Sequence, residues 1–536
     1  MHCRGRTLST PILKFWLALV VIALAIHLGG FPLIDADEGR NAEVAREMAA
    51  TNDYVMPRLD GLPYLDKPIV YFAAEAAAME VLGPTELAAR LPAYLFTLAT
   101  AAVLFFFARR LWGGETPWIA AIVFLSMPLT IAFARTVIFD SALTFFVVVA
   151  LVAFYFALEG GRPARPWSIL AWLAMALAMI TKGPVTFLLV LFVALPYSFW
   201  RKRVRALFPI AGIIVFAAVI APWLWGVTRV VPEFLEYVLV TETAARMATD
   251  ELKRTGPPWY FVPYLIGGAL PWSLVALFSW KRMKKRELVY LALWIAIPFL
   301  FFSINQSKQP QYILPLLPAL ALIVARIWHE ARTRGAAIVL AAFGALLLVA
   351  PFFFHRTKMK PEIASVADET ALALGIAFAL GGLVALFAAR REIVLAALSL
   401  PMIAIPLLTQ PLMLGIAGRR SAKSFVEELR PHLTPRTEII GVEAFTGSLA
   451  FYLGRPVIVV TGDASELTSN YLIRRYEKFT SDPKSPLKRL PYFEQSLGAC
   501  CPMYVLRNDD ATRRARLESR GFRRIAEGAH HVAYAK

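Results

Sequence analysis

Cysteine is scarce in this chain. Only three of its 536 residues are cysteines. Cys500 and Cys501 are adjacent, and Cys3 stands near the N-terminus. Neither a disulfide framework nor metal-ligand spacing follows from that pattern. The C-terminal region has no glycine-rich nucleotide-binding motif. The chain has no internal repeat, which disfavours a secondary transporter.

Acidic residues are also in the minority, with 38 Asp and Glu against 56 Lys and Arg. An excess of positive charge can indicate nucleic-acid binding. Here, however, many of the basic residues stand in short blocks between apolar runs, such as RKRVR (201–205) and KRMKKR (281–286). Basic loops of this kind orient membrane helices, so we expect no nucleic-acid partner.

Long apolar runs are plentiful. The chain is 58% hydrophobic, and its mean hydropathy is +0.58. From Phe15 to about Ile416, runs of roughly 17–25 residues recur, each long enough to cross a bilayer. They predict a polytopic α-helical membrane protein with about 13 transmembrane helices. The expected spans are approximately 12–31, 88–108, 117–134, 141–158, 167–181, 184–200, 206–227, 259–280, 287–303, 312–329, 336–354, 371–389 and 393–416.

The positive-inside rule gives these spans an orientation. The N-terminal run has a basic start and no small-residue cleavage pattern, so we expect it to stay as a signal anchor. With the N-terminus in the cytoplasm, the basic loops fall inside, and the C-terminal segment falls outside. The loops expected outside are 35–84, 135–140, 181–184, 228–258 and 305–311.

The first outer loop opens with DADEGRNAEVAREM (Asp35–Met48). Asp35 and Glu38 stand at capping-box spacing, and the apolar periodicity predicts a helix after them. A second amphipathic stretch covers 69–83, and both helices are expected to lie along the membrane surface.

The composition turns polar from about Gly418. TEIIGVEAF, RPVIVVTGD, YVLRNDD and HHVAYA read as strands, with GSLAFYLG as a short helix. We therefore predict a transmembrane domain over 1–417 and a small periplasmic α/β domain over 418–536.

Charged and aromatic side chains gather at the outer ends of the spans. Each has a simpler explanation by itself: Asp140 as an acid at a helix N-terminus, Lys182 as a snorkelling lysine, Asp66 and Lys67 as a solvated turn pair. Taken together, cations at the lipid boundary suit a phosphate head group. A nearby carboxylate can orient or deprotonate an attacking hydroxyl. The candidate catalytic residues are Asp37, Glu38 and Asp140, and the candidate phosphate-binding residues are Arg40, Tyr64, Lys67, Lys182, Arg246, Lys308 and Tyr312.

An ordered series of motifs runs through the membrane part. After DADEGRNAEVAREM come PRLDGLPYLDKP, ELAARLPAYL, RTVIFDSALTFF, ITKGP, PWYFVPYLIGGALPW and KQPQYILPLLP. In order and spacing they resemble the ArnT-like lipid A aminoarabinose transferases. These belong to the membrane glycosyltransferases of GT-C fold, which include the protein O-mannosyltransferases. The C-terminal domain adds little to the resemblance.

The resemblance implies an inverting glycosyltransferase in the bacterial inner membrane, with its active site on the periplasmic side. The donor would be a polyprenyl-phosphate-linked sugar, such as 4-amino-4-deoxy-L-arabinose or a related sugar, and the acceptor lipid A or another envelope glycolipid. Asp37 matches the acid proposed as catalytic. The groups that match the donor phosphate site are Arg40, Lys67, Arg246 and Tyr312, with Tyr64 beside them, and Asp140 and Lys182 match other polar residues of the same cavity.

Two positions depart from the family pattern. Members often carry a His and a Glu that can hold a metal, and here the positions are Thr241 and Asp66. This difference argues against a metal site there. A protein O-mannosyltransferase with the same fold remains the alternative, because the sequence does not identify the acceptor.

Overall fold

The computed structural model describes residues 10–159, 164–238, 256–282, 286–354, 361–499 and 501–536. The chain divides into two compact units. The first comprises Met1–Leu28 and Ala93–Leu412, and the second comprises Gly29–Pro92 and Met413–Lys536.

The first unit is built from apolar helices. In the described residues, eight helices are long and apolar enough to cross a membrane. A bent pair of helices, kinked by 102°, makes a possible ninth crossing, and four more apolar helices are shorter. Together they account for all of the predicted spans. The long helical segments are Glu86–Leu111, Asp140–Glu159, Ala164–Lys182, Val204–Val230, Pro310–Glu330, Arg334–Phe353, Ala364–Phe387 and Arg391–Leu408.

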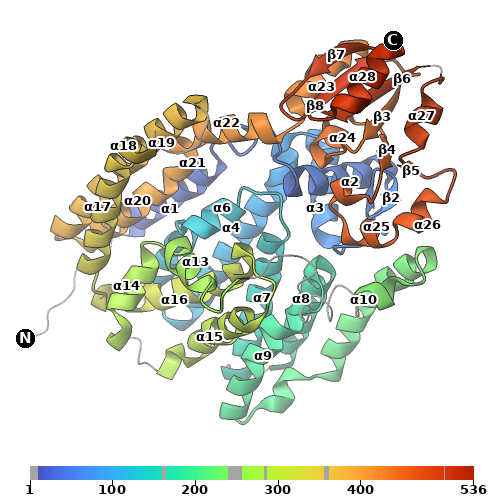
Figure 1. Ribbon diagram of the computed structural model, residues 1–536. Coiled ribbons are helices and arrows are strands. Elements are labelled where there is room, and N and C mark those ends of the chain that lie inside the picture. The colour runs from blue at the N-terminus through green and yellow to red at the C-terminus, as the bar shows by residue number, and fades with distance from the viewer. Residues whose placement is uncertain (1–9, 160–163, 239–255, 283–285, 355–360, 500) are drawn as a thin grey trace, which may run out of the picture. The chain divides into compact units, whose positions relative to one another are not determined.

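The helix labels follow Figure 1. The elements are α1 (Thr10–Ala25), α4 (Glu86–Leu111), α5 (Thr116–Leu125), α6 (Pro128–Phe133), α7 (Asp140–Glu159), α8 (Ala164–Lys182), α9 (Val185–Trp200), α10 (Ile210–Val230), α11 (Phe234–Glu236), α13 (Phe261–Gly268), α14 (Trp272–Phe278), α15 (Val289–Ile304), η5 (Pro310–Leu316), α16 (Leu317–Ile327), α17 (Arg334–Val349), α18 (Pro351–Phe354), α19 (Pro361–Phe387), α20 (Arg391–Ile403), α21 (Ile405–Leu408) and α22 (Gln410–Arg420). Of these, α4 begins and α22 ends in the second unit.

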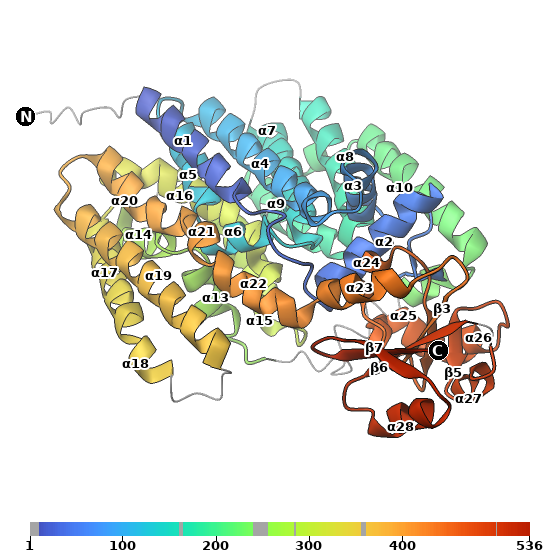
Figure 2. The same ribbon diagram turned by 90° about the horizontal axis from the view of Figure 1, so that it is seen from above.

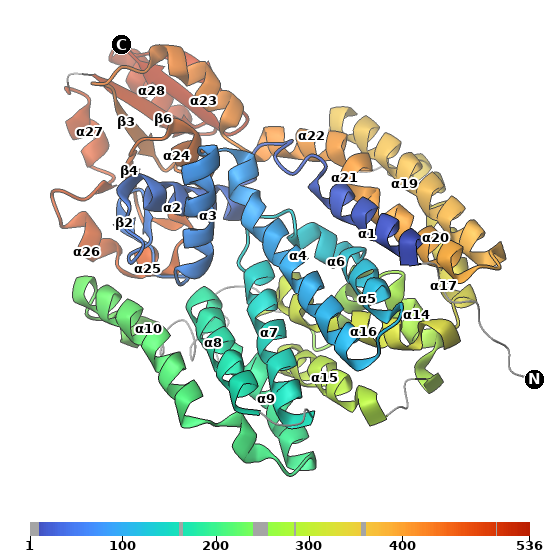
Figure 3. The same cartoon turned by 180° about the vertical axis from the view of Figure 1, so that it is seen from behind.

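Helix α7 forms the centre of one bundle. It packs against α8 and α9, and the three helices lie side by side in Figure 3. Nearly all of its side chains are buried, from one end of the helix to the other, because neighbouring helices cover it on all sides. A second group consists of α17, α19 and α20, in which α19 packs between the other two. The first group places Asp140 and Lys182 at adjoining helix ends.

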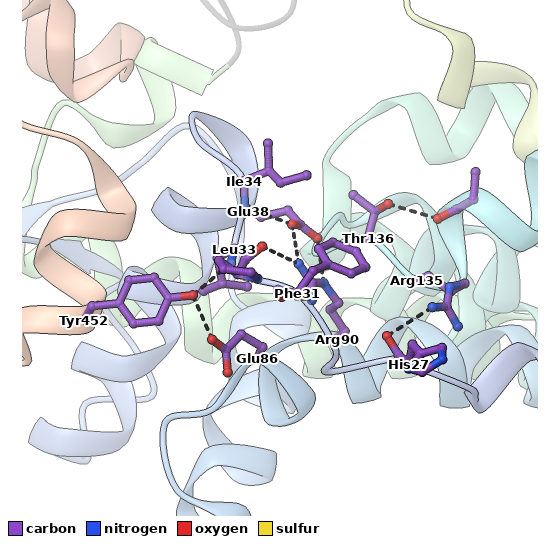
Figure 4. A network of polar contacts seen from close by, with 12 residues as sticks. His27, Phe31, Leu33, Ile34, Glu38, Glu86, Arg90, Arg135, Thr136 and Tyr452 are labelled. Atoms are coloured by element: carbon purple, nitrogen blue, oxygen red, sulfur yellow. Dashed lines mark hydrogen bonds and ion pairs between the residues drawn. The ribbon is translucent and has the colours of Figure 1, made fainter. Parts of the chain in front are cut away.

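The end of α1 is held by a buried arginine. Arg135 donates hydrogen bonds from Nη1 to the carbonyl oxygens of Leu24 (2.6 Å) and Ile26 (2.7 Å). Its Nη2 donates to the carbonyl oxygen of His27 at 3.1 Å (Figure 4). A helix end leaves such carbonyls without partners in the helix, so this guanidinium satisfies them inside the protein.

The second unit combines the first loop with the C-terminal part of the chain. The loop contributes α2 (Asp37–Thr51), the hairpin β1 (Arg58–Leu59) and β2 (Leu62–Pro63), and α3 (Val70–Leu82). The two helices predicted in this loop are thereby found. Helix α2 packs against α24 (Gly447–Leu453) at two glycines. A Cβ on Gly447 would lie 2.2 Å from the Arg40 backbone nitrogen, and one on Gly39 would lie 2.4 Å from that of Ser448. The two backbones therefore approach as only glycine permits.

The C-terminal part forms a six-stranded sheet in the order β5-β4-β3-β6-β8-β7. Strands β3, β4, β5 and β6 run parallel, and β8 pairs antiparallel with β6 on one side and with β7 on the other. Figure 1 labels all six strands. The strands are β3 (Glu438–Val442), β4 (Ile458–Thr461), β5 (Leu487–Arg489), β6 (Pro502–Arg507), β7 (Arg523–Glu527) and β8 (His531–Ala535). The remaining helices are α23 (Lys423–Leu429), α25 (Asn470–Arg474), α26 (Tyr476–Thr480), α27 (Tyr492–Ser496) and α28 (Ala511–Ser519).

The predicted fold class is confirmed: a many-helix membrane protein with an α/β part at its C-terminal end. Four of the six strands lie where the apolar runs predicted them. The sequence missed β5 and β7, which are the two edge strands, because LKR and RRIAE lack an apolar run. The domain boundary near residue 418 stays a prediction.

Candidate functional site

Asp37 and Arg40 form the exposed start of α2. The Arg40 Nη2 atom lies 2.6 Å from the Asp37 Oδ1 atom. The Asp37 side chain is 60% exposed, whereas that of Arg40 is 13% exposed. Arg40 Nη1 also donates to the carbonyl oxygen of Thr468 at 2.8 Å and to its hydroxyl at 2.7 Å. A fixed guanidinium thus holds a solvent-accessible carboxylate in a defined orientation.

Arg40 keeps one donor unused. Its guanidinium lies over the Tyr64 ring, 5.8 Å from the ring centre, and Tyr64 is buried. The Arg40 Nε atom is buried and has no hydrogen-bond partner in the described part of the protein. A buried donor without a partner is costly, and an anionic ligand oxygen would satisfy it.

Glu38 has a different environment. Its carboxylate is buried against Arg90, with Nη2 to Oε2 at 2.7 Å and Nε to Oε1 at 3.0 Å. Arg90 also donates to the carbonyl oxygen of Phe31 at 2.8 Å (Figure 4). A further hydrogen bond runs from Arg90 to the carbonyl oxygen of Pro32 at 3.1 Å. The pair ties the chain before α2 to the start of α4. These contacts favour a structural role for Glu38, and its catalytic role stays a prediction.

The capping-box interpretation is wrong for Asp35. The residue at the N-cap of α2 is Ala36, and no side chain caps the helix there. Instead, the Asp35 carboxylate accepts hydrogen bonds from the backbone nitrogen (2.9 Å) and the hydroxyl of Ser448. Burial raises the pKa of Asp35. Glu38 does reach back, since its Oε2 accepts from the backbone nitrogen of Ile34 at 3.1 Å.

Lys67 and Asp66 are not the solvated pair that their spacing allows. The Asp66 carboxylate accepts from the backbone nitrogens of Asn470 (2.9 Å) and Tyr471 (3.0 Å) at the start of α25. The Lys67 Nζ atom donates to the Asp66 carbonyl oxygen at 2.6 Å. Tyr64 comes from the same loop and packs edge-on against Phe72. The loop therefore presents Lys67 from an anchored backbone.

Asp140, Lys182 and Tyr312 form a cluster within the first unit. Lys182 Nζ lies 2.5 Å from Asp140 Oδ1, and both side chains are largely buried. The same ammonium lies over the Tyr312 ring, 5.0 Å from its centre. Asp140 begins α7 and Lys182 ends α8, so the pair joins two helix ends. Burying charged groups is costly, so this pair stays a candidate for a functional role.

The Lys308 side chain is held by backbone carbonyl groups of the preceding residues. Its Nζ donates to the carbonyl oxygens of Ser303 (3.0 Å) and Asn305. Desolvation lowers its pKa. Arg246 and Thr241 lie outside the described residues. Within the described ranges, no group of three or more His, Cys, Asp or Glu could hold a metal ion.

Several known proteins are similar to this chain. A family model described as dolichyl-phosphate-mannose-protein mannosyltransferase matches residues 66–225. The crystal structure of ArnT from Cupriavidus metallidurans bound to undecaprenyl phosphate aligns over 98% of both chains, with a TM-score of 0.87 and 26% identity. In sequence and in fold, the chain is thus similar to the ArnT-like membrane glycosyltransferases of GT-C fold.

Curated ArnT relatives agree with this assignment. Undecaprenyl phosphate-alpha-4-amino-4-deoxy-L-arabinose arabinosyl transferase 1 of Pseudomonas fluorescens is 32% identical over 357 residues, which is 64% of each chain. The corresponding transferase of Pseudomonas aeruginosa is 30% identical over the same share. The similarity thus spans less than two thirds of these ArnT relatives.

Two residues that contact the candidate residues were not among the sequence candidates. Arg90 lies in the quoted motif ELAARLPAYL, and a lone arginine in the first turns of an apolar span was a signal for a buried partner. Thr468 had no comparable signal, because it lies in a polar segment more than 400 residues from Arg40.

Proposed function

We propose that this chain transfers a sugar from an undecaprenyl-phosphate donor to lipid A or another envelope glycolipid. The sugar is 4-amino-4-deoxy-L-arabinose or a related one. The observation that carries the proposal is the similarity, over nearly the full length, to an ArnT structure bound to undecaprenyl phosphate. The roles assigned to individual residues of the two units are part of this proposal.

Donor binding requires cations that can meet a lipid phosphate. Arg40 supports this role, because its unpaired Nε–H can bind a phosphate oxygen while its other nitrogens hold it in place. Lys182 supplies an ammonium whose position is set by Asp140 and the Tyr312 ring. Lys67, Arg246 and Lys308 are the remaining proposed cations. Together they would stabilise the negative charge that develops on the departing phosphate.

The transfer step exchanges one C–O bond for another. An acceptor oxygen attacks the anomeric carbon of the sugar as the bond from that carbon to the donor phosphate oxygen breaks. The electron pair leaves with undecaprenyl phosphate, and the anomeric configuration inverts. A phosphate acceptor carries no proton that must be removed, so Asp37 would orient it. A hydroxyl acceptor needs a base, and exposed Asp37 is the proposed one.

The proposed location is the bacterial inner membrane, with the site on the periplasmic face. The basic loops support this orientation, because they fall on the opposite side from the candidate residues. The proposed domain arrangement, with residues 418–536 as a periplasmic α/β domain, follows from the same count of spans.

Transfer of mannose to protein hydroxyls is the second candidate. It is favoured by the match of residues 66–225 to the mannosyltransferase family model. Mass spectrometry of lipid A and of envelope proteins, from cells with and without the chain, separates the two. Loss of a sugar-sized mass from lipid A supports the first proposal, and loss from proteins supports the second. No change in either pool contradicts both.

Asp37→Asn tests the site itself. The expected loss of transfer rate in membranes is about 100-fold or more, since positioned carboxylates contribute on that order. Glu494→Gln is a matched control, because Glu494 is also an exposed carboxylate paired with an arginine. The control should transfer sugar normally. Wild-type transfer by Asp37→Asn, at equal membrane content, would remove Asp37 from the proposed mechanism.

A further inference from the structure

A cavity of about 760 Å³ lies within the first unit, away from every residue proposed above. It is formed by the end of α14, the end of α19 and the starts of α17 and α20, and Figures 1 and 2 show α17, α19 and α20 side by side. Its lining includes three arginines, Arg332, Arg334 and Arg391, and no described acidic residue. The lining therefore favours an anion.

The three arginines have different tasks. The Arg391 guanidinium forms intramolecular hydrogen bonds, because it donates to the carbonyl oxygens of Ala331 (3.0 Å) and His329 (3.4 Å). It thereby holds the connection between α16 and α17. Arg332 and Arg334 are exposed and form no ion pair with the described residues. Their guanidinium groups are available to a ligand.

Apolar side chains begin directly beside these arginines. Phe278 is 40% exposed, Phe387 81% and Ile338 55%. The Phe278 ring lies against Gly335, where a Cβ would come within 2.7 Å of it. Large apolar side chains exposed on membrane helices face lipid acyl chains. The cavity thus joins a basic rim to a surface of the kind that contacts lipid tails.

Both connections that carry the arginines lie on one side of the membrane. The residues before α17 and those between α19 and α20 are separated by two crossings, one out and one back. Their shared basic character places them in the cytoplasm by the positive-inside rule. Basic pockets between helices at that boundary are where anionic head groups bind.

We propose that this cavity binds the phosphate head group of an anionic glycerophospholipid. Arg332 and Arg334 contact the phosphate, while the acyl chains lie along Phe278 and Phe387. The site is independent of the sugar transfer proposed above. Another cavity, of about 510 Å³ in the second unit, contrasts with it because its lining contains the carboxylates of Asp35, Glu443, Glu466 and Asp509.

Native mass spectrometry of the full chain tests the proposal. The detergent-solubilised protein is mixed with phosphatidylglycerol or phosphatidylcholine, and bound lipid is counted. Wild-type protein should retain phosphatidylglycerol preferentially. Arg332→Gln/Arg334→Gln should lower that affinity about tenfold or more, because two charge-assisted contacts are lost. Arg109→Gln/Arg110→Gln, the control, removes equal charge from the exposed last turn of α4 and should retain the lipid.

A second variant guards against general effects of charge. Ala388→Phe keeps every arginine and fills part of the cavity, so it should also reduce phosphatidylglycerol retention. The proposal is overturned if both variants retain lipid as the wild type does, or if the control loses it equally. It is also overturned if millimolar inorganic phosphate displaces the lipid, because the site would then be one for free anions.

Discussion

Arg90→Met is the substitution with the clearest expected energetic effect. It removes a guanidinium that is fully buried and donates four hydrogen bonds. Methionine keeps the length of the side chain but cannot donate. Glu38, which is 5% exposed, would then keep a buried carboxylate without the guanidinium that pairs with it in the wild type.

The magnitude follows from these contacts. Breaking a buried ion pair by removing one partner costs about 3–5 kcal/mol, because the other charge is left uncompensated. The carbonyl oxygens of Phe31 and Pro32 also lose their donor, at roughly 1–3 kcal/mol for an unsatisfied buried group. We therefore expect Arg90→Met to lower the free energy of unfolding by about 4 kcal/mol or more.

A double-mutant cycle separates the uncompensated charge from the lost packing. Glu38→Gln/Arg90→Met carries no charge at either position, so it should be more stable than Arg90→Met alone by about 2 kcal/mol. The assay is unfolding of the full chain in mixed micelles, followed by tryptophan fluorescence. Arg516→Met, which breaks an exposed pair with Glu494, should leave stability unchanged.

Two results would refute the reasoning. If the effects of Glu38→Gln and Arg90→Met simply add, the two groups are not energetically coupled. If Arg90→Met is as stable as the Arg516→Met control, the pair does not secure the chain before α2.

Two further predictions concern the same unit. Gly447→Ala should destabilise the protein by about 1–3 kcal/mol and disturb Arg40, because its Cβ would meet the α2 backbone; Gly498→Ala, which has open space at its Cβ, is the control, and equal melting temperatures would contradict the close packing. Burial raises the pKa of Glu43 to about 8, so stability should fall as the pH rises from about 4.5 to 8. Glu43→Gln should make melting less dependent on pH over that interval, and an unchanged profile would contradict the shift.

Much of the membrane part could be predicted from sequence. A bilayer demands apolar runs of a minimum length, and charged blocks mark the ends of those runs, so each span has a local signal. The strands β3, β4, β6 and β8 also had one, because a buried strand reads as a short apolar run. The edge strands β5 and β7 carry charged residues instead and were missed.

The candidate site was predicted less completely. Polar residues at span ends identified Asp140 and Lys182, and the structure brings them into contact. The roles proposed for all these residues stay predictions. The local pattern around Asp35 predicted a helix cap wrongly. Capping-box spacing contains no information on Ser448, the actual partner of Asp35, which lies 413 positions away. The sequence alone offered no reason to separate Glu38 from the other acids of the cluster. The structure does, because it pairs Glu38 with buried Arg90.

Composition and periodicity by themselves determined that this chain crosses the membrane many times and carries a small sheet at its end. Those properties depend on the solvent that each segment faces, which short windows of sequence record. Only the tertiary structure decided which charges meet, which stay buried and which remain open to a ligand. Such contacts join positions hundreds of residues apart, so no local pattern contains them.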